Sequence, residues 1–164
     1  MIKVSYSQEV IRIIDAAYVI NFLKKAEGYE FSAVSDAKGV MRGRFCNIDK
    51  KAYTHFSSKI LNSVSACLIF NQVSLVYGFE TGILNVGNGL VDAGRVVVKD
   101  TKVVCKRIVD TESSDDFVFM FAKHKDHKGR DVFFAHMELS DGAFIVEGSG
   151  VITNLDKHGV PGGS

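Results

Sequence analysis

ILNSVSACLIFNQVSLVYGF, residues 60–79, decides how the rest of this chain must fold, because no charged residue interrupts it. A run of roughly 20 such residues matches the length of a membrane helix. Its polar side chains argue against that interpretation, since each would carry a hydrogen-bonding group into hydrocarbon. They are Asn62, Ser63, Ser65, Asn71, Gln72 and Ser74. The stretch therefore predicts a helix that spans no membrane and is enclosed by protein on all its faces.

Two consecutive amides, Asn71 and Gln72, interrupt the apolar part of this predicted helix. Consecutive helical side chains point about 100° apart, so at least one of the two amides must face the interior. A buried amide destabilises the fold unless it is hydrogen-bonded. Each of these residues is therefore either a group that acts on a substrate or a structural amide bonded to backbone carbonyls.

The composition excludes several classes of protein. With 164 residues, 46% of them hydrophobic and 24% charged, the chain fits one globular domain with a real core. The net charge of +1 gives no basis for binding nucleic acid or an anionic membrane. The three cysteines have no metal-binding spacing and are odd in number, so we expect no metal, free thiols and a reducing compartment. The first residues lack the pattern of a signal peptide, and we expect a cytoplasmic protein.

The segments before residue 60 predict a helix and then strands. Residues 7–27 place apolar side chains close to a 3.6-residue period, with Ser7 as the N-cap, and predict an amphipathic helix. Residues 29–46 predict two short strands with a turn at 36–39. Residues 47–59 form a polar approach to the central helix, with a serine near its end as the expected cap.

The segments after residue 80 predict a glycine-rich loop at 82–94, which covers one mouth of the fold, and then a meander of antiparallel strands over 95–153. The tail, 154–164, is polar and glycine-rich and is expected to be flexible. These pieces fit one domain, residues 1–153, of the α+β class. In it an antiparallel sheet wraps around the long central helix at 60–79, which is the hotdog fold. A sandwich with helices on one face would instead require a polar stripe on this helix.

The segment YTHFSSKILNSVSACLIFNQVSLVYG, residues 53–78, resembles the central-helix region of hotdog enzymes and is most similar to the FcoT-type acyl-CoA thioesterases. In that family a His-Phe pair precedes the helix and an Asn-Gln pair lies within it; here these pairs are His55-Phe56 and Asn71-Gln72. The final strands, GRDVFFAHMELSDGAFIVEGSG, are also similar to the end of many hotdog domains. The resemblance implies a homodimer with joined sheets that hydrolyses acyl thioesters of coenzyme A or of acyl carrier protein, without a cofactor.

The resemblance also points to the residues that act. Hotdog dehydratases carry an acid in the central helix, and residues 60–79 contain none, so an acid–base pair would be incomplete. An amide can orient water or donate to a thioester oxygen, and the resemblance assigns this role to Asn71 and a second role to Tyr53. A phenol can donate to a developing oxyanion, and the His55 imidazole can carry protons near pH 7. The substrate-binding residues we expect are Tyr29, Phe56, Phe70, Gln72, Val73 and Tyr77.

The sequence leaves two other functions open. Relatives of this kind also act in lipopeptide pathways, where an amine adds to an enoyl thioester, and hydration or dehydration is a further variant. The same fold can also serve as a non-catalytic acyl-thioester binding protein, which would equally lack a carboxylate. The basic segment 123–130 predicts a solvated hairpin tip, whose alternative role is contact with the phosphates of coenzyme A or with an acidic carrier protein.

Overall fold

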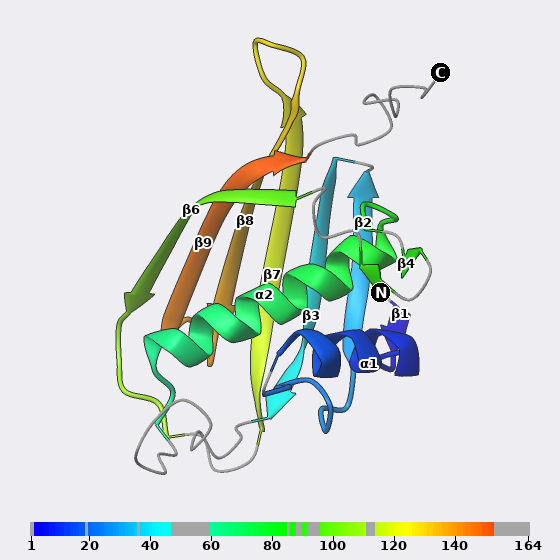
Figure 1. Cartoon of the computed structure of the whole chain (residues 1–164). Helices are drawn as coiled ribbons and strands as arrows, with labels where there is room; N and C mark the ends of the chain where they lie inside the picture. The colour runs from blue at the N-terminus through cyan, green and yellow to red at the C-terminus, as the bar shows by residue number, and fades with distance from the viewer. Residues whose placement is uncertain are drawn as a thin grey trace.

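One antiparallel sheet carries a long helix across one of its faces (Figure 1). The computed structural model describes residues 2–18, 20–35, 37–46, 60–84, 86–87, 90–91, 96–110 and 114–152. The strand order in the sheet is β1-β2-β3-β7-β8-β9-β6, with every neighbouring pair antiparallel. The strands are β1 (Ile2–Val4), β2 (Tyr29–Ser35), β3 (Lys38–Cys46), β6 (Val96–Cys105), β7 (Ser114–Lys125), β8 (Asp131–Leu139) and β9 (Phe144–Ile152).

Among the described residues, the remaining elements are two helices and a small hairpin outside the main sheet. Helix α1 covers Gln8–Ala17 and α2 covers Ser63–Glu80, while β4 (Val86–Gly87) pairs only with β5 (Leu90–Val91). The antiparallel meander predicted after residue 95 is confirmed, and most of the uncharged stretch forms the helix α2. In the part of the chain that the structure describes, no helix is both long and apolar enough to cross a membrane. The predicted flexible tail falls outside the described residues.

The length of α2 follows from the strand order. This helix connects β3 to β6, and β7, β8 and β9 lie between those two strands in the sheet. Strands lie about 4.8 Å apart, so the connection must travel about 19 Å across the sheet. The 18 residues of α2 give about 27 Å at 1.5 Å per residue, which is enough to cross this width obliquely. Figure 1 shows α2 lying across the sheet in this way.

The ends of α2 are fixed by short polar side chains rather than by charges. Asn62 is the N-cap, and its side-chain oxygen accepts a 2.9 Å hydrogen bond from the Ser65 amide. The helix therefore starts three residues later than the predicted residue 60, because Ile60 bridges to Asp110 and Leu61 donates to the Val109 carbonyl. The serines expected to cap it lie outside the described residues.

The N-terminal helix ends much earlier than predicted. We expected it to run over 7–27, and it stops at Ala17, where Tyr18 adopts an extended backbone with φ −130° and ψ 141°. The next residues are held by Gln72, which accepts from the Phe22 amide at 2.9 Å and donates to the Ile20 carbonyl at 2.6 Å. These bonds hold residues 20–22 outside a helix, and they take precedence over the helical periodicity of the sequence.

One stripe of α2 is incompletely covered within the single chain, and a partner or a further segment would have to cover it to enclose the helix as predicted. Val64 is 53% exposed, Asn71 is exposed, and the residues between and beyond them at helical spacing are half-buried. This exposed stripe consists of Val64, Cys67, Leu68, Asn71, Ser74 and Leu75. It contains no charged residue, although charge is what a solvated helix face ordinarily carries.

Candidate functional site

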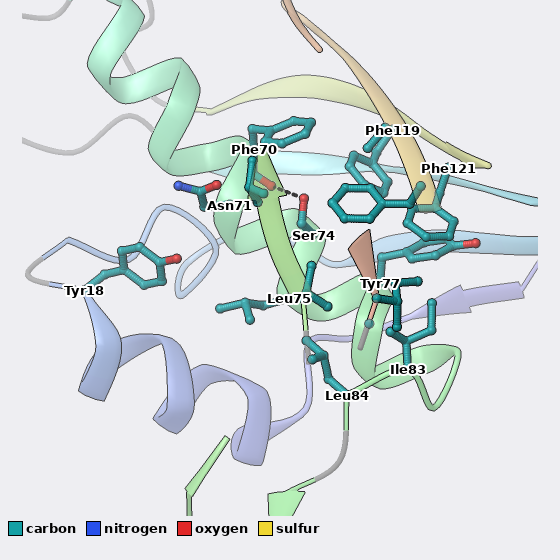
Figure 2. A pocket seen from close by; sticks show the side chains of 16 residues that line it. Tyr18, Phe70, Asn71, Ser74, Leu75, Tyr77, Ile83, Leu84, Phe119 and Phe121 are labelled. Atoms are coloured by element: carbon teal, nitrogen blue, oxygen red, sulfur yellow. Dashed lines mark hydrogen bonds between the residues drawn. The ribbon is translucent and has the colours of Figure 1, made fainter. Parts of the chain in front are cut away.

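An apolar cavity of about 210 Å³ lies beside α2, between this helix and the inner face of β6 to β9. Figure 2 shows its lining side chains. One wall is aromatic and consists of Phe70, Tyr77, Phe119, Phe121 and Phe133. Another part is aliphatic and consists of Leu75, Ile83, Leu84, Val96, Val98 and Ile152. The described residues of the lining include no ionisable side chain except tyrosine, so this cavity suits an uncharged organic group.

The aromatic wall is a continuous set of ring contacts. The Tyr77 and Phe121 centroids lie 4.7 Å apart, and Phe121 stacks on Phe133 at 5.8 Å with 15° between the planes. Two glycines of β9 make room for these rings. A Cβ atom at Gly148 would lie 2.9 Å from the Phe70 ring, and one at Gly150 would lie 2.6 Å from the Phe133 ring. The EGSG sequence of β9 therefore shapes the floor of the cavity.

Four polar side chains of described residues line the cavity, and they differ in their hydrogen bonds. The Ser74 hydroxyl donates to the Phe70 carbonyl at 2.7 Å, within the helix. The Tyr77 hydroxyl is packed against Gly39, where a Cβ atom would lie 2.5 Å from its oxygen. Asn71 and Tyr18 make no hydrogen bond through their side chains to any residue that the structure describes. The cavity thus has one uncommitted amide and one uncommitted phenol.

Burial keeps both tyrosines of the cavity protonated. Desolvation raises the pKa of Tyr77 to about 12 and also raises the pKa of Tyr18 above its usual value. At neutral pH both phenols are therefore neutral hydrogen-bond donors rather than bases. Asn71 cannot titrate. The described lining can polarise a carbonyl group or orient water, but it has no group that would accept a proton at neutral pH.

Three residues of the predicted site line this cavity: Asn71, Phe70 and Tyr77. Gln72 and Val73, which the sequence predicts to bind substrate, lie outside the lining of this cavity. Val73 is fully buried in the core. Gln72 is also fully buried, and both ends of its amide are bonded to the backbone of the segment after α1. One of the two consecutive amides faces the interior, as the sequence predicts, and it is Gln72.

Tyr29, the other described residue of the predicted set, is also outside the cavity lining. It is buried in β2, its ring packs on Tyr6 at 4.9 Å, and its hydroxyl donates to the Glu80 carboxylate at the end of α2. Burial, followed by this hydrogen bond, raises the pKa of Tyr29. The contacts join β2 to the end of α2. The predicted site residues Tyr53, His55 and Phe56 lie outside the described residues.

The sequence reasoning missed Tyr18 and the strand phenylalanines. The sequence places Tyr18 within the predicted helix at 7–27, whereas in the structure Tyr18 borders the cavity because α1 ends at Ala17. Phe119 and Phe121 alternate in the run FVFMF of β7, and Phe133 lies on the neighbouring β8. Alternation predicts that such rings share one face of the sheet. It does not predict which of them border a cavity.

Two charged clusters among the described residues lie outside the lining of this cavity. Among the described residues, no group of three His, Cys, Asp or Glu side chains could hold a metal ion. His136 lies 3.3 Å from both Glu138 and Glu147 on the sheet face opposite α2. At the β7–β8 tip, Lys125 pairs with Asp131 at 2.8 Å and Arg130 with Asp126 at 2.7 Å. Half of the basic charge of this tip is therefore neutralised locally.

The chain has measurable likenesses only among solved structures. No protein-family model matches it, and no curated protein matches it. A hypothetical thioesterase of Streptococcus pneumoniae, crystallised with coenzyme A, is 10% identical, with 88% of this chain and 97% of that chain covered and a TM-score of 0.48. A Haemophilus influenzae thioesterase is 16% identical over 80% and 82% of the two chains, with a TM-score of 0.43. A mutant Pseudomonas aeruginosa thioesterase is 13% identical over 76% and 81%, with a TM-score of 0.40.

Proposed function

We propose that this chain is a hotdog-fold thioesterase that hydrolyses acyl thioesters of coenzyme A or of acyl carrier protein. The observation that carries this proposal is an apolar cavity beside α2 with an uncommitted amide, Asn71, on its exposed side. The acyl group occupies the cavity, and the thioester lies at Asn71, where the cavity meets solvent. The likenesses to thioesterases have TM-scores below 0.5, so the support comes from the residues of this chain.

The reaction needs a polarised carbonyl and a positioned water. Water attacks the thioester carbonyl carbon, the carbon–sulfur bond breaks, and the products are a carboxylic acid and a thiol. Asn71 binds the carbonyl oxygen or the attacking water through its amide, which requires no charge. His55 and Tyr53, from the segment that precedes α2, complete the site in this proposal: His55 transfers protons and Tyr53 donates to the oxyanion. No metal or organic cofactor takes part.

The cavity volume limits the acyl group. An apolar cavity of about 150 Å³ binds benzene, so about 210 Å³ holds an acyl group of roughly six to eight carbons. Acyl chains much longer than this would extend past Asn71 into solvent or into a partner subunit. We therefore expect medium-length acyl groups to be hydrolysed fastest.

A second copy of the chain is the partner we propose. Strand β6 is at an edge of the sheet and pairs only with β9. It exposes Val97 and Val98 by 49% and 48%, an unusual composition for an unprotected edge. The uncharged exposed stripe of α2 is the other surface that a partner would cover. Joining two β6 edges in a homodimer would protect the strand edge and enclose the exposed side of the cavity. The free thiols at Cys46, Cys67 and Cys105 are compatible with the cytoplasm.

The test is thiol release from coenzyme A thioesters of two to sixteen acyl carbons, comparing wild type with Asn71→Ala. We expect hydrolysis with a maximum at medium length and a loss of about 100-fold or more in kcat for Asn71→Ala, the size of effect seen for one oxyanion donor. Ser63→Ala, an exposed position on the same helix outside the cavity lining, is the matched control and should retain activity.

Other outcomes would assign another function. Tight binding of acyl-coenzyme A without thiol release would identify a non-catalytic binding protein. Loss of the double bond of an enoyl thioester, with the thioester bond left intact, would identify addition of water or an amine. If the protein neither binds nor hydrolyses any of these thioesters, the proposal is refuted.

A further inference from the structure

Two of the polar side chains that line the cavity are free to bind a ligand. Of the four polar side chains that line it, Ser74 is bonded to the helix backbone and Tyr77 points its hydroxyl at Gly39. Tyr18 and Asn71 remain, and neither side chain is bonded to another described residue. Figure 2 shows Tyr18 and Asn71 toward the same side of the cavity, away from Tyr77 and Phe121, with the Tyr18 hydroxyl directed toward α2. Among the described side chains of the lining, these two are the ones free to bond a ligand.

The backbone holds Tyr18 firmly in this place. Tyr18 is the C-cap of α1, and its amide donates to the Ile14 carbonyl at 2.9 Å. Two and four residues later, Ile20 and Phe22 are bonded to the buried amide of Gln72. Gln72 follows Asn71 directly in α2. The backbone shortly after Tyr18 is therefore bonded to the same turn of α2 that carries Asn71.

The chemistry of the pair matches a thioester carbonyl. Both groups are uncharged donors, and both border an apolar cavity, where a hydrogen bond is stronger than in water. A neutral hydrogen-bond donor interacts more strongly with an oxygen as negative charge develops on it, so it stabilises the transition state more than the ground state. Partial burial keeps the Tyr18 phenol protonated, since desolvation raises its pKa.

We infer that Tyr18 is a catalytic residue, which donates a hydrogen bond to the carbonyl oxygen of the acyl thioester bound beside Asn71. This inference rests on the proposed function of the cavity. Tyr18 keeps its proton throughout: water adds to the carbonyl carbon, negative charge develops on the carbonyl oxygen, and the carbon–sulfur bond then breaks. The departing thiolate takes up a proton released by the attacking water. In this arrangement the Asn71 amide orients the attacking water.

The kinetic test is Tyr18→Phe, which keeps the ring in the wall and removes only the hydroxyl. On hexanoyl-coenzyme A we expect kcat to fall about 100-fold with KM changed little, because the lost contact is strongest in the transition state. Tyr6→Phe is the matched control. It removes a phenol that donates to the Arg44 carbonyl at 3.1 Å, away from the cavity lining, and should retain wild-type kcat. Thermal denaturation of all three proteins verifies that each is folded.

A spectroscopic test measures the hydrogen bond from Tyr18 to the carbonyl group without turnover. In a ketone analogue of hexanoyl-coenzyme A, with a methylene group in place of sulfur, infrared absorption reports hydrogen bonding to the carbonyl. We expect the carbonyl band to shift to lower frequency on binding to wild type and to Tyr6→Phe, and to lose most of this shift in folded Tyr18→Phe. An equal shift in folded Tyr18→Phe, or an unchanged kcat in an active enzyme, overturns the inference. Analogue binding with a Tyr18-dependent shift but no thiol release would instead overturn the proposed hydrolysis and leave the contact standing.

Discussion

Replacing Gln72 by leucine tests how the segment after α1 is held in place. Gln72 is fully buried and forms two hydrogen bonds to backbone groups, 2.6 Å to the Ile20 carbonyl and 2.9 Å from the Phe22 amide. Leucine has a similar volume, so the substitution leaves little cavity but removes both partners. Each backbone group left buried and unbonded costs about 1–3 kcal/mol, which gives about 4 kcal/mol for the pair. That is a large part of the roughly 5–15 kcal/mol that stabilises a typical domain.

The measurement is chemical unfolding of Gln72→Leu followed by circular dichroism, with Asn71→Leu as the matched control. Asn71 has no side-chain hydrogen bond to a described residue and is exposed, so its replacement should change the free energy of unfolding by less than about 0.5 kcal/mol. Gln72→Leu should lower the melting temperature by about 8–16 °C, at 2–4 °C per kcal/mol for a chain of this size. A loss below about 1 kcal/mol for Gln72→Leu would refute the structural role of this amide.

Two further predictions concern the cavity and the partner. Phe133→Ala removes a ring from the aromatic wall, and we expect it to destabilise the protein by about 3 kcal/mol and to move the preferred acyl group to a longer chain, measured as kcat/KM across the coenzyme A thioesters. An unchanged preference would mean that the acyl group lies elsewhere. Val98→Lys places a charge on the β6 edge, and we expect it to convert a dimer into a folded monomer in sedimentation analysis; a wild-type monomer at micromolar concentration would contradict the proposed interface.

Local patterns in the sequence predicted the elements of this fold well. The uncharged stretch around Phe70 became α2, and alternation of apolar residues located β7, β8 and β9. These elements each bury a face or a stripe, and the spacing of apolar residues along the sequence indicates such burial directly. The turn of the β7–β8 hairpin was also predictable, because Gly129 adopts a φ of 73° that favours glycine.

The features that escaped prediction depend on contacts between residues far apart in sequence. The end of α1 is fixed by bonds between Gln72 and a segment 50 residues earlier, and no local signal reports such a partner. The same distance hides Tyr18, which joins the cavity only because the chain becomes extended after Ala17. Asn71 could be singled out from the sequence, since an amide in an apolar helix demands a reason. Which of Asn71 and Gln72 faced the interior depended on how α2 is rotated on the sheet.

The exposed stripe of α2 is the feature of the sequence that the single chain does not explain. A helix that packs on a sheet with one face needs only an apolar stripe, and its outer face gains solubility from charge. Here Val64, Leu68 and Leu75 lie on the outer side with no acid or base among their helical neighbours. The cavity opens on the same side, at Asn71. A surface that is both uncharged and adjacent to an apolar cavity is what a partner subunit would cover, and this surface therefore supports the homodimer proposed above.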